Sequence, residues 1–279
     1  MVVFPNAKIN LGLNVVKKRN DGYHNIESVF VPIPITDALE INQNKLGKTQ
    51  FSCSGIKIPS DGKANLVERA FSIMQSKYNI PSVDLDLLKQ IPIGAGLGGG
   101  SADAAACILG LNDLFQLQLN ENELFNLAGQ LGADCAFFLK NKMVYSEGIG
   151  DEFSDFFVDL SQLHFIVVYP NIHVSTVEAY KHITPCKPER NIREILNNPV
   201  ETWKKELKND FEKSVFIQCP EIGEIKQELY NLGATYASMS GSGSAVFGIF
   251  KEAPVISFSH LGKSWKFNIP CPSSKEKSK

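Results

Sequence analysis

Five glycines fall within seven residues, from Gly94 to Gly100, and an alanine-rich segment follows them without a break. Glycine adopts positive φ angles freely and lets the backbone approach a ligand closely, whereas alanine is the strongest helix former. The stretch from Pro92 to Ala106 therefore predicts a tight loop that leads directly into a helix. Free N–H groups and the positive end of the helix dipole meet at such a junction, so we expect it to bind phosphate.

Three other interpretations of the glycine stretch stay open. The spacing Gly94-x-Gly96-x-x-Gly99 satisfies the dinucleotide fingerprint, which expects a strand running straight into the first glycine and an acidic residue on a second strand. Here Pro92 precedes the first glycine, and the acidic residue at the right distance, Asp113, continues a helical pattern. A nucleotide P-loop requires Lys-Ser/Thr where Gly100-Ser101 stands, and a flexible linker would be followed by serine, proline and charge.

Length, charge and hydropathy narrow the class of protein. The chain has 279 residues, enough for one large domain or two of ordinary size, and 43% of them are hydrophobic, as in ordinary globular proteins. The formal charge of −2 gives no reason to expect nucleic acid or an anionic membrane as the main partner. The sequence holds no apolar run long enough for a membrane span and no signal-peptide pattern at its start. We therefore expect a cytoplasmic protein.

The six cysteines are scattered along the chain and form no Cys-x-x-Cys pair or Cys/His cluster. This pattern favours reduced thiols over a zinc site or a disulfide framework. Cys135 adjoins Asp134, and the favoured interpretation of its side chain is a small apolar packing group.

Alternating polar and apolar residues predict a strand from Ala7 to Val16, with Lys8 and Asn10 on its polar face. A turn at 20–22 joins it to a second strand, so the two form a hairpin. Further strands are expected at 37–41, 49–53, 83–87 and 163–169, and helices at 65–77, 101–114, 120–131, 176–182, 191–198 and 221–232. Asp134 stands between a helix stop and an apolar stretch, which is typical of the N-cap of a following helix.

We place the boundary between the two halves of the chain near residues 151–160. A second loop of small residues lies at 237–248 and leads into an apolar strand. The polar tail at 272–279 is predicted to be disordered.

Three motifs occur in an order that resembles one family of small-molecule kinases, which includes galactokinase, homoserine kinase and mevalonate kinase. They are the lysine-bearing strand Ala7-Lys8-Ile-Asn10-Leu11, the central loop from Pro92 to Ser101, and the C-terminal loop Ser240-Gly-Ser-Gly243. Two further segments, Asp21-Gly-Tyr-His24 and Leu131-Gly-Ala-Asp134, are similar to the branch of this family whose substrate carries a cytidine diphosphate group. The resemblance spans residues 5 to about 248.

The resemblance implies an α+β fold in two parts with the site between them. Residues 1–155 would form a ribosomal-protein-S5-like α/β domain that carries the phosphate loop, and residues 156–279 a ferredoxin-like domain on the substrate side. It also implies direct phosphorylation of an alcohol on a small molecule, with ATP as co-substrate and Mg²⁺. Two other functions stay open: a sister kinase with a different alcohol, and a non-catalytic ligand sensor, which would be expected to lack Lys8 or Asp134. An oxidoreductase ranks last, because no strand runs straight into the glycines.

Lys8 and Asp134 match the family's catalytic pair. Asp134 would accept the proton of the substrate hydroxyl or orient that hydroxyl, with both roles open, and Lys8 would stabilise the transferring phosphoryl group. Asn65 matches the segment on the adenine side, and Ser101 would cap the helix and reach phosphate or Mg²⁺. Ala102 replaces a serine that is frequent in the family, so a phosphate contact expected there must come from the backbone or from Ser101. The residues that would wrap the ATP phosphates are Pro92, Gly94, Gly96, Leu97, Gly98, Gly99, Gly100 and Ser101.

On the substrate side, His24 matches the residue that reads the cytosine edge, a task suited to an imidazole that can both donate and accept. Tyr23 and Tyr180 match the aromatic residues that would stack on the two faces of the base. The weaker candidates for polar substrate contacts are Asn10, Thr176, Gly241 and Ser242.

Overall fold

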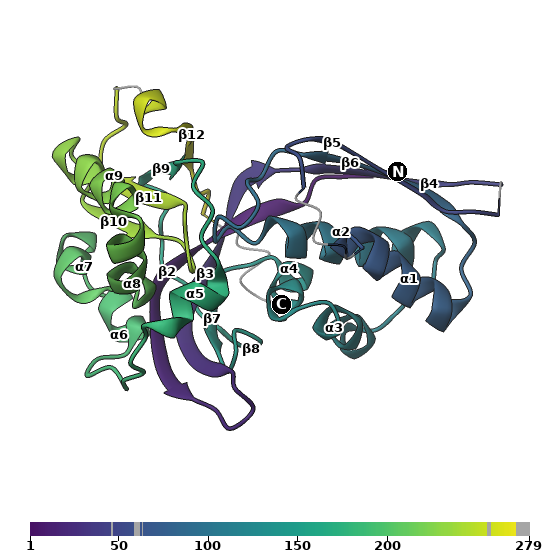
Figure 1. Ribbon diagram of the computed structural model, residues 1–279, viewed down its shortest axis with the longest axis horizontal. Helices are drawn as coiled ribbons and strands as arrows, with labels where there is room; N and C mark the ends of the chain where they lie inside the picture. Colours follow the sequence, from purple (N-terminus) through teal and green to yellow (C-terminus); the bar gives the residue numbers. More distant parts are fainter. Residues whose placement is uncertain (46, 59–61, 63, 256–257, 272–279) are drawn as a thin grey trace.

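Two lobes lie side by side in the computed structural model, which describes residues 1–45, 47–58, 62, 64–255 and 258–271. The long strands β2 (Asn6–Lys18) and β3 (His24–Thr36) lie between the lobes (Figure 1). They pair antiparallel as the predicted hairpin, with Lys8 opposite Pro32 and Asn10 opposite Phe30. The tail predicted to be disordered, 272–279, lies outside the described residues.

The strands of the described residues form three four-stranded sheets. The first sheet has the order β1 (Val2–Val3), β4 (Ala38–Gln43), β6 (Val83–Lys89) and β5 (Gln50–Gly55), with β5 parallel to β6 and the other pairs antiparallel. The second has the antiparallel order β2, β3, β7 (Val144–Glu147) and β8 (Glu152–Asp155). The third has the antiparallel order β10 (Tyr236–Met239), β11 (Val246–Phe250), β9 (His164–Tyr169) and β12 (Lys263–Asn268).

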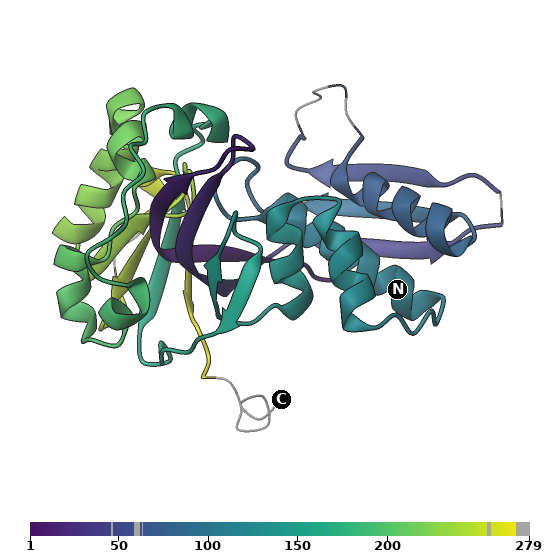
Figure 2. The same cartoon turned by 90° about the horizontal axis from the view of Figure 1, so that it is seen from below.

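Helices cover one face of the first sheet (Figures 1 and 2). They are α1 (Leu66–Tyr78), α2 (Gly99–Leu114), α3 (Glu121–Gly129) and α4 (Ala133–Lys140). Strand β6 alternates, so that Leu85 and Leu87 are buried beneath these helices while Asp86 points to the other side. A capping box starts α1, where the Asn65 side chain accepts from the helix and Glu68 reaches back to the N-H of Asn65.

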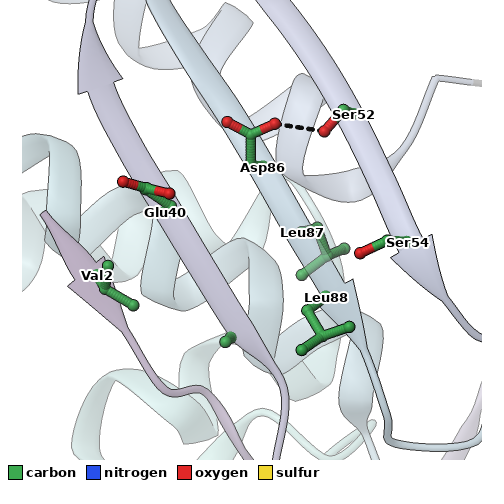
Figure 3. Close-up of a pocket in the computed structure, with 8 residues that line it drawn as sticks. Val2, Glu40, Ser52, Ser54, Asp86, Leu87 and Leu88 are labelled. Atoms are coloured by element: carbon green, nitrogen blue, oxygen red, sulfur yellow. Dashed lines mark hydrogen bonds between the residues drawn. The ribbon is translucent and has the colours of Figure 1, made fainter.

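The opposite face of the first sheet carries a shallow open hollow (Figure 3). Its lining is half polar and half apolar, with Glu40, Ser52 and Asp86 beside Val2 and Leu88. Ser52 donates a hydrogen bond to Asp86 across the strands. The glycine loop leads into α2 on the helix-covered face, so the hollow lies on the other side of the sheet from it.

In the second lobe, strands β9, β10 and β11 of the third sheet are buried on both faces, whereas the edge strand β12 is partly exposed. Residues of β9 and β11 pack on one face against β2, β3, α6 and α7, and on the other face against α8 and α9. The helices of this lobe are α5 (Thr176–Lys181), α6 (Ile192–Leu196), α7 (Val200–Glu206), α8 (Phe211–Gln218) and α9 (Pro220–Asn231), and a short 3₁₀ turn covers Ser259–Leu261. Because β2 and β3 share this core, the lysine-bearing strand is held by both lobes.

The α+β fold implied by the resemblance is confirmed, and so is each predicted element over most of its length. Three predictions of local structure are wrong. The loop expected at 237–248 is shorter, because 237–239 belong to β10 and 246–248 to β11. Ser101 does not cap α2, because the chain takes a left-handed turn at Gly98 and the helix already begins at Gly99. Asp134 is not an N-cap, because Gly132 occupies that position and Asp134 lies in the first turn of α4.

Among the described helices, none has the length and apolar character that a membrane crossing requires.

Candidate active site

The buried ammonium of Lys8 faces the carboxylate of Asp134. Lys8 lies on β2 and is 4% exposed, and its Nζ is 3.7 Å from Oδ2 of Asp134. The same Nζ donates a 2.6 Å hydrogen bond to Oδ1 of Asn10 and lies 4.7 Å from the ring centroid of Phe30. Burial lowers the pKa of Lys8 from its ordinary value, and the Asp134 charge acts against this shift. The pair is therefore a desolvated cation beside a carboxylate that remains partly open to solvent.

Asn10 is held in place by a short chain of hydrogen bonds along the hairpin. Its Nδ2 donates to Oγ of Ser28 at 2.9 Å, and this hydroxyl donates to the carbonyl of Gly12 at 2.6 Å. With its amide group engaged in this way, Asn10 must direct its oxygen toward Lys8. Ser28 is fully buried and belongs to none of the sequence motifs, so it was not predicted as part of the site.

The glycine loop lies directly against the lysine strand. The backbone N–H of Lys8 donates to the carbonyl of Leu97 at 3.0 Å, and α2 begins two residues later. A Cβ on Gly98 would lie 2.8 Å from the ring of Phe138 and 3.3 Å from Cγ of Lys8. The free N–H groups at the start of α2 therefore lie close to the Lys8 side chain, as an anion site that also needs a cation would require.

The thiol of Cys135 hydrogen-bonds with the side chain of Ser101, in the first turn of α2. Burial raises the pKa of this thiol to about 11. It therefore stays protonated near neutral pH, as expected for a packing group, and the six cysteines are all free.

The C-terminal glycine loop meets the phosphate loop backbone to backbone. Oγ of Ser240 donates to the carbonyl of Gly96 at 2.8 Å, and the N–H of Ala245 donates to the carbonyl of Ala95 at 3.0 Å. A Cβ on Gly241 would lie 3.4 Å from Oδ1 of Asn10. All three motifs of the resemblance thus converge at one point between the lobes.

Of the three aromatic residues expected on the substrate side, His24 and Tyr180 contact each other. The ring of His24 stacks on that of Tyr180, with centroids 4.7 Å apart and an interplanar angle of 19°. Burial lowers the pKa of His24, and Lys18 lowers it further, so the imidazole is neutral at neutral pH. Burial also raises the pKa of Tyr180 to about 12, with a smaller effect from the charge of Asp134. Tyr23 is 61% exposed and makes no ring contact with either residue in the described part of the chain.

Thr176 and Ser242, two of the weaker candidates for polar substrate contacts, lie next to each other. Oγ1 of Thr176, at the start of α5, is 3.1 Å from Oγ of Ser242 in the C-terminal loop. Asn65 lies at the other end of the site, where its side chain accepts from the N–H of Val67 at 2.8 Å. The following residue, Leu66, would be 3.6 Å from a Cβ on Gly100, so the start of α1 abuts the phosphate loop.

A buried cluster of charge beneath the phosphate loop was missed by the sequence analysis. Nζ of Lys89 is 2.9 Å from Oδ2 of Asp103 and also pairs with Asp37, and all three residues are at most 2% exposed. A Cβ on Gly99 would lie 2.8 Å from this Nζ. Asp37 also accepts from the N–H groups of Gln90 and Ile91, so it fixes the chain where β6 leads into the loop. The sequence feature that could have revealed this cluster is the alternation along β6, which places Lys89 on the same inward face as Leu85 and Leu87.

Comparisons with known proteins show which family the chain resembles. The model of the GHMP kinases N terminal domain matches residues 65–142, and that of the GHMP kinases C terminal domain matches residues 191–258. The 4-diphosphocytidyl-2-C-methyl-D-erythritol kinase of Bacteroides fragilis is 51% identical over 252 residues, which are 90% of this chain and 92% of that protein. The Porphyromonas gingivalis protein of the same name is 47% identical over 256 residues, 91% of this chain and 93% of its own.

Solved structures show the same relationship. A crystal structure of 4-(cytidine 5'-diphospho)-2C-methyl-D-erythritol kinase matches with a TM-score of 0.79 at 30% identity, over 98% of this chain and 100% of that one. The mevalonate kinase of Methanococcus jannaschii matches with a TM-score of 0.68 at 15% identity, over 96% of this chain and 97% of that one, and so shares the fold. The chain therefore belongs to the GHMP kinase family and is an ATP-dependent small-molecule kinase.

Proposed function

We propose that this kinase phosphorylates the 2-hydroxyl of 4-diphosphocytidyl-2-C-methyl-D-erythritol, a step of the non-mevalonate route to isoprenoid precursors. The observation that carries the proposal is the Lys8–Asp134 pair, 3.7 Å apart at the point where the two glycine loops meet. The names of the relatives support the choice of substrate, and so does the His24–Tyr180 stack beside the pair. Phosphoryl transfer depends mainly on positioning and electrostatics, which this arrangement supplies.

Asp134 orients the acceptor hydroxyl and takes its proton as the phosphoryl group arrives. Its carboxylate oxygens can accept from that hydroxyl, and one of them lies 3.7 Å from the Lys8 ammonium. Lys8 stabilises the charge on the transferring group, and Asn10 keeps the ammonium directed toward it through the 2.6 Å hydrogen bond. Proton transfer of this kind contributes roughly 10²–10⁴-fold to a rate.

The phosphates of ATP bind at the loop from Gly94 to Ser101, where the N–H groups at the start of α2 face them. Within the described residues there is no group of three or more His, Cys, Asp or Glu side chains that could hold a metal ion. Mg²⁺ commonly keeps its waters and binds through substrate phosphates and one or two protein oxygens, so the sparse donor set here fits an ion that enters with ATP. The hydroxyl of Ser101 would be its protein neighbour. Bound there, Mg²⁺ would neutralise phosphate charge.

The cytosine of the acceptor stacks on Tyr180 in the place that the His24 ring now occupies. His24 then turns to the edge of the base, where a neutral imidazole can both donate and accept. The exposed ring of Tyr23 closes over the opposite face. Base–aromatic stacking is worth about 1–3 kcal/mol per base, enough to select a cytidine-bearing acceptor.

The test is ADP release by the purified protein with MgATP and each of four alcohols: the cytidine-bearing acceptor, mevalonate, homoserine and galactose. Turnover with the first compound alone is the expected result. Turnover of another alcohol would make the chain a sister kinase, and no turnover with any of the four would favour a ligand sensor.

A pair of variants tests the assigned chemistry. Asp134→Asn should lower kcat by at least about 100-fold, because the amide cannot accept the proton, while binding of a non-hydrolysable ATP analogue stays the same. Asp86→Asn is the matched control, since Asp86 lies on the far face of the first sheet (Figure 3). Near-normal turnover by Asp134→Asn would contradict the role of this carboxylate.

A further inference from the structure

Four consecutive residues, Asn209 to Glu212, contact three separate elements of the site. They stand at the junction of α7 and α8, and we call them the Asn209–Glu212 segment. None of them belongs to the motifs of the resemblance. Each of the four side chains makes a different contact, and together these contacts connect the lysine strand, the C-terminal glycine loop and Tyr180.

Asn209 holds the C-terminal glycine loop. Its Nδ2 donates to the carbonyls of both Met239 and Gly241, each at 2.8 Å, and its Oδ1 accepts from the N–H of Phe211 at 3.0 Å. The side chain is 3% exposed, so water cannot replace these bonds readily. Both amide hydrogens are therefore committed to fixing the backbone on either side of Ser240.

Asp210 ties the segment to the strand that carries Lys8. Its Oδ2 accepts from the N–H of Val15 at 2.7 Å, and its own N–H donates to the carbonyl of Leu13 at 2.9 Å. The carbonyl of Lys208 accepts from the N–H of Leu13 at 2.8 Å. The segment thus adds a short bridge to β2, just beyond Asn10.

Glu212 and Phe211 complete the set. Oε1 of Glu212 accepts from the N–H of Met239 at 2.9 Å, and its Oε2 pairs with Nζ of Lys226 at 2.5 Å. The ring of Phe211 meets that of Tyr180 edge to face, with centroids 4.7 Å apart and an angle of 89°. The aromatic platform and the loop with Gly241 and Ser242 therefore rest on one rigid segment.

We propose that the Asn209–Glu212 segment is a positioning element for the acceptor, which sets Tyr180 and the Gly241–Ser242 turn at a fixed place relative to the Lys8 strand. The proposal rests on the proposed function in that the acceptor is a cytidine-bearing alcohol whose base stacks on Tyr180. The phosphate loop has anchors that the segment does not contact, the bonds of Ala245 to Ala95 and of Lys8 to Leu97. The segment should therefore govern binding of the acceptor more than binding of ATP.

Asn209→Asp tests the loop contact. The substitution keeps the oxygen that accepts from Phe211 but points a negative oxygen at the carbonyls of Met239 and Gly241. Losing one buried hydrogen bond is worth roughly tenfold, so the KM for the acceptor should rise by about tenfold or more, with the KM for ATP within about twofold of the wild-type value.

Phe211→Leu tests the aromatic contact and covers the case in which Asn209→Asp fails to fold. It removes the edge that meets Tyr180 but keeps an apolar side chain in the core of this lobe. The KM for the acceptor should again rise, by roughly fivefold, because an aromatic pair contributes about 1 kcal/mol beyond its buried area.

Asn191→Asp is the matched control. Asn191 caps α6 by accepting from the N–H of Arg193 at 2.8 Å, as Asn209 accepts from Phe211, but its amide donates to the hydroxyl of Tyr145, away from the site. It should change neither KM. Equal losses for acceptor and ATP in the folded variants, or no change in the acceptor KM, would overturn the proposal. If the wild type turned over a different alcohol and Asn209→Asp raised the KM for that alcohol alone, the proposed substrate would be wrong and the positioning role would stand.

Discussion

Replacing Gly96 by alanine is a direct test of the contact between the two glycine loops. A Cβ on Gly96 would lie 1.9 Å from the carbonyl oxygen of Ser240 and 2.8 Å from its carbonyl carbon. Ordinary contact begins at 3.4 Å, so the difference requires one backbone to move by about 1.5 Å. Both partners are main chain, so rotation of a side chain cannot relieve the overlap.

The control for this substitution is Gly233→Ala. Gly96 has φ +74° and Gly233 has φ +96°, so alanine strains the backbone at both positions, at a cost of about 1–2 kcal/mol. A Cβ on Gly233 would meet nothing within 4 Å. The two variants should therefore share the backbone cost, and Gly96→Ala should lose about 1–3 kcal/mol more from the overlap.

The assay is kcat from ADP release, measured beside urea unfolding of both variants. A misplacement of about 1 Å in an active site can cost roughly 100-fold in rate, so Gly96→Ala should lose at least that much in kcat while Gly233→Ala stays near the wild type. Equal kcat values in the two variants would refute the argument that the loops must touch for transfer to occur. A loss of folding in Gly96→Ala alone would be seen in the unfolding curve and would place the contact among the determinants of stability.

Two further predictions concern groups on either side of the site. Burial raises the pKa of Asp103 to about 7 from 3.8, so the folded protein keeps a proton that the unfolded chain has released in this range. The contribution of Asp103 to the free energy of unfolding should fall as the pH rises from about 4 to about 7, and Asp103→Asn should remove this part of the slope. The same slope in urea unfolding of the two proteins would contradict the assignment. His24→Ala should raise the KM for the cytidine-bearing acceptor about tenfold through loss of the contacts to the base edge, with the KM for ATP unchanged, and unchanged acceptor kinetics would show that the base is read elsewhere.

Local patterns were sufficient to predict most of the fold. The alternation around Lys8 gave β2, and Asn120 with Glu123 formed the start of α3 as a capping box. The glycine stretch predicted a loop that leads into a helix, which is α2. These features depend on neighbours within a few residues, so they can be read from the chain itself. The family resemblance then supplied the pairing of Lys8 with Asp134, which no local pattern contains.

The residues that were missed act through contacts distant in sequence. Lys89 meets Asp37 across 52 positions, and Asp210 meets Val15 across 195. A buried lysine cannot be told from a solvated one until the strand register and its partners are known. The helix start at Gly99 was missed for a related reason, because a glycine in the left-handed region at Gly98 begins a helix without any side-chain cap to read.

The phosphate loop is held by three consecutive carbonyl groups, and this explains how a flexible sequence becomes a preformed site. The carbonyls of Ala95, Gly96 and Leu97 accept hydrogen bonds from Ala245, Ser240 and Lys8 respectively. Each carbonyl dipole is thereby directed toward a donor of the protein, whereas a carbonyl facing the phosphate would repel it. Fixing the backbone of one residue costs about 1–2 kcal/mol in conformational entropy. Because folding has already fixed this loop, less of the binding free energy of ATP is lost to ordering it. Two of the three donors come from the second lobe and the third from the strand between the lobes. The geometry of phosphoryl transfer in this kinase therefore depends on how the lobes pack, as well as on the residues that touch the phosphates.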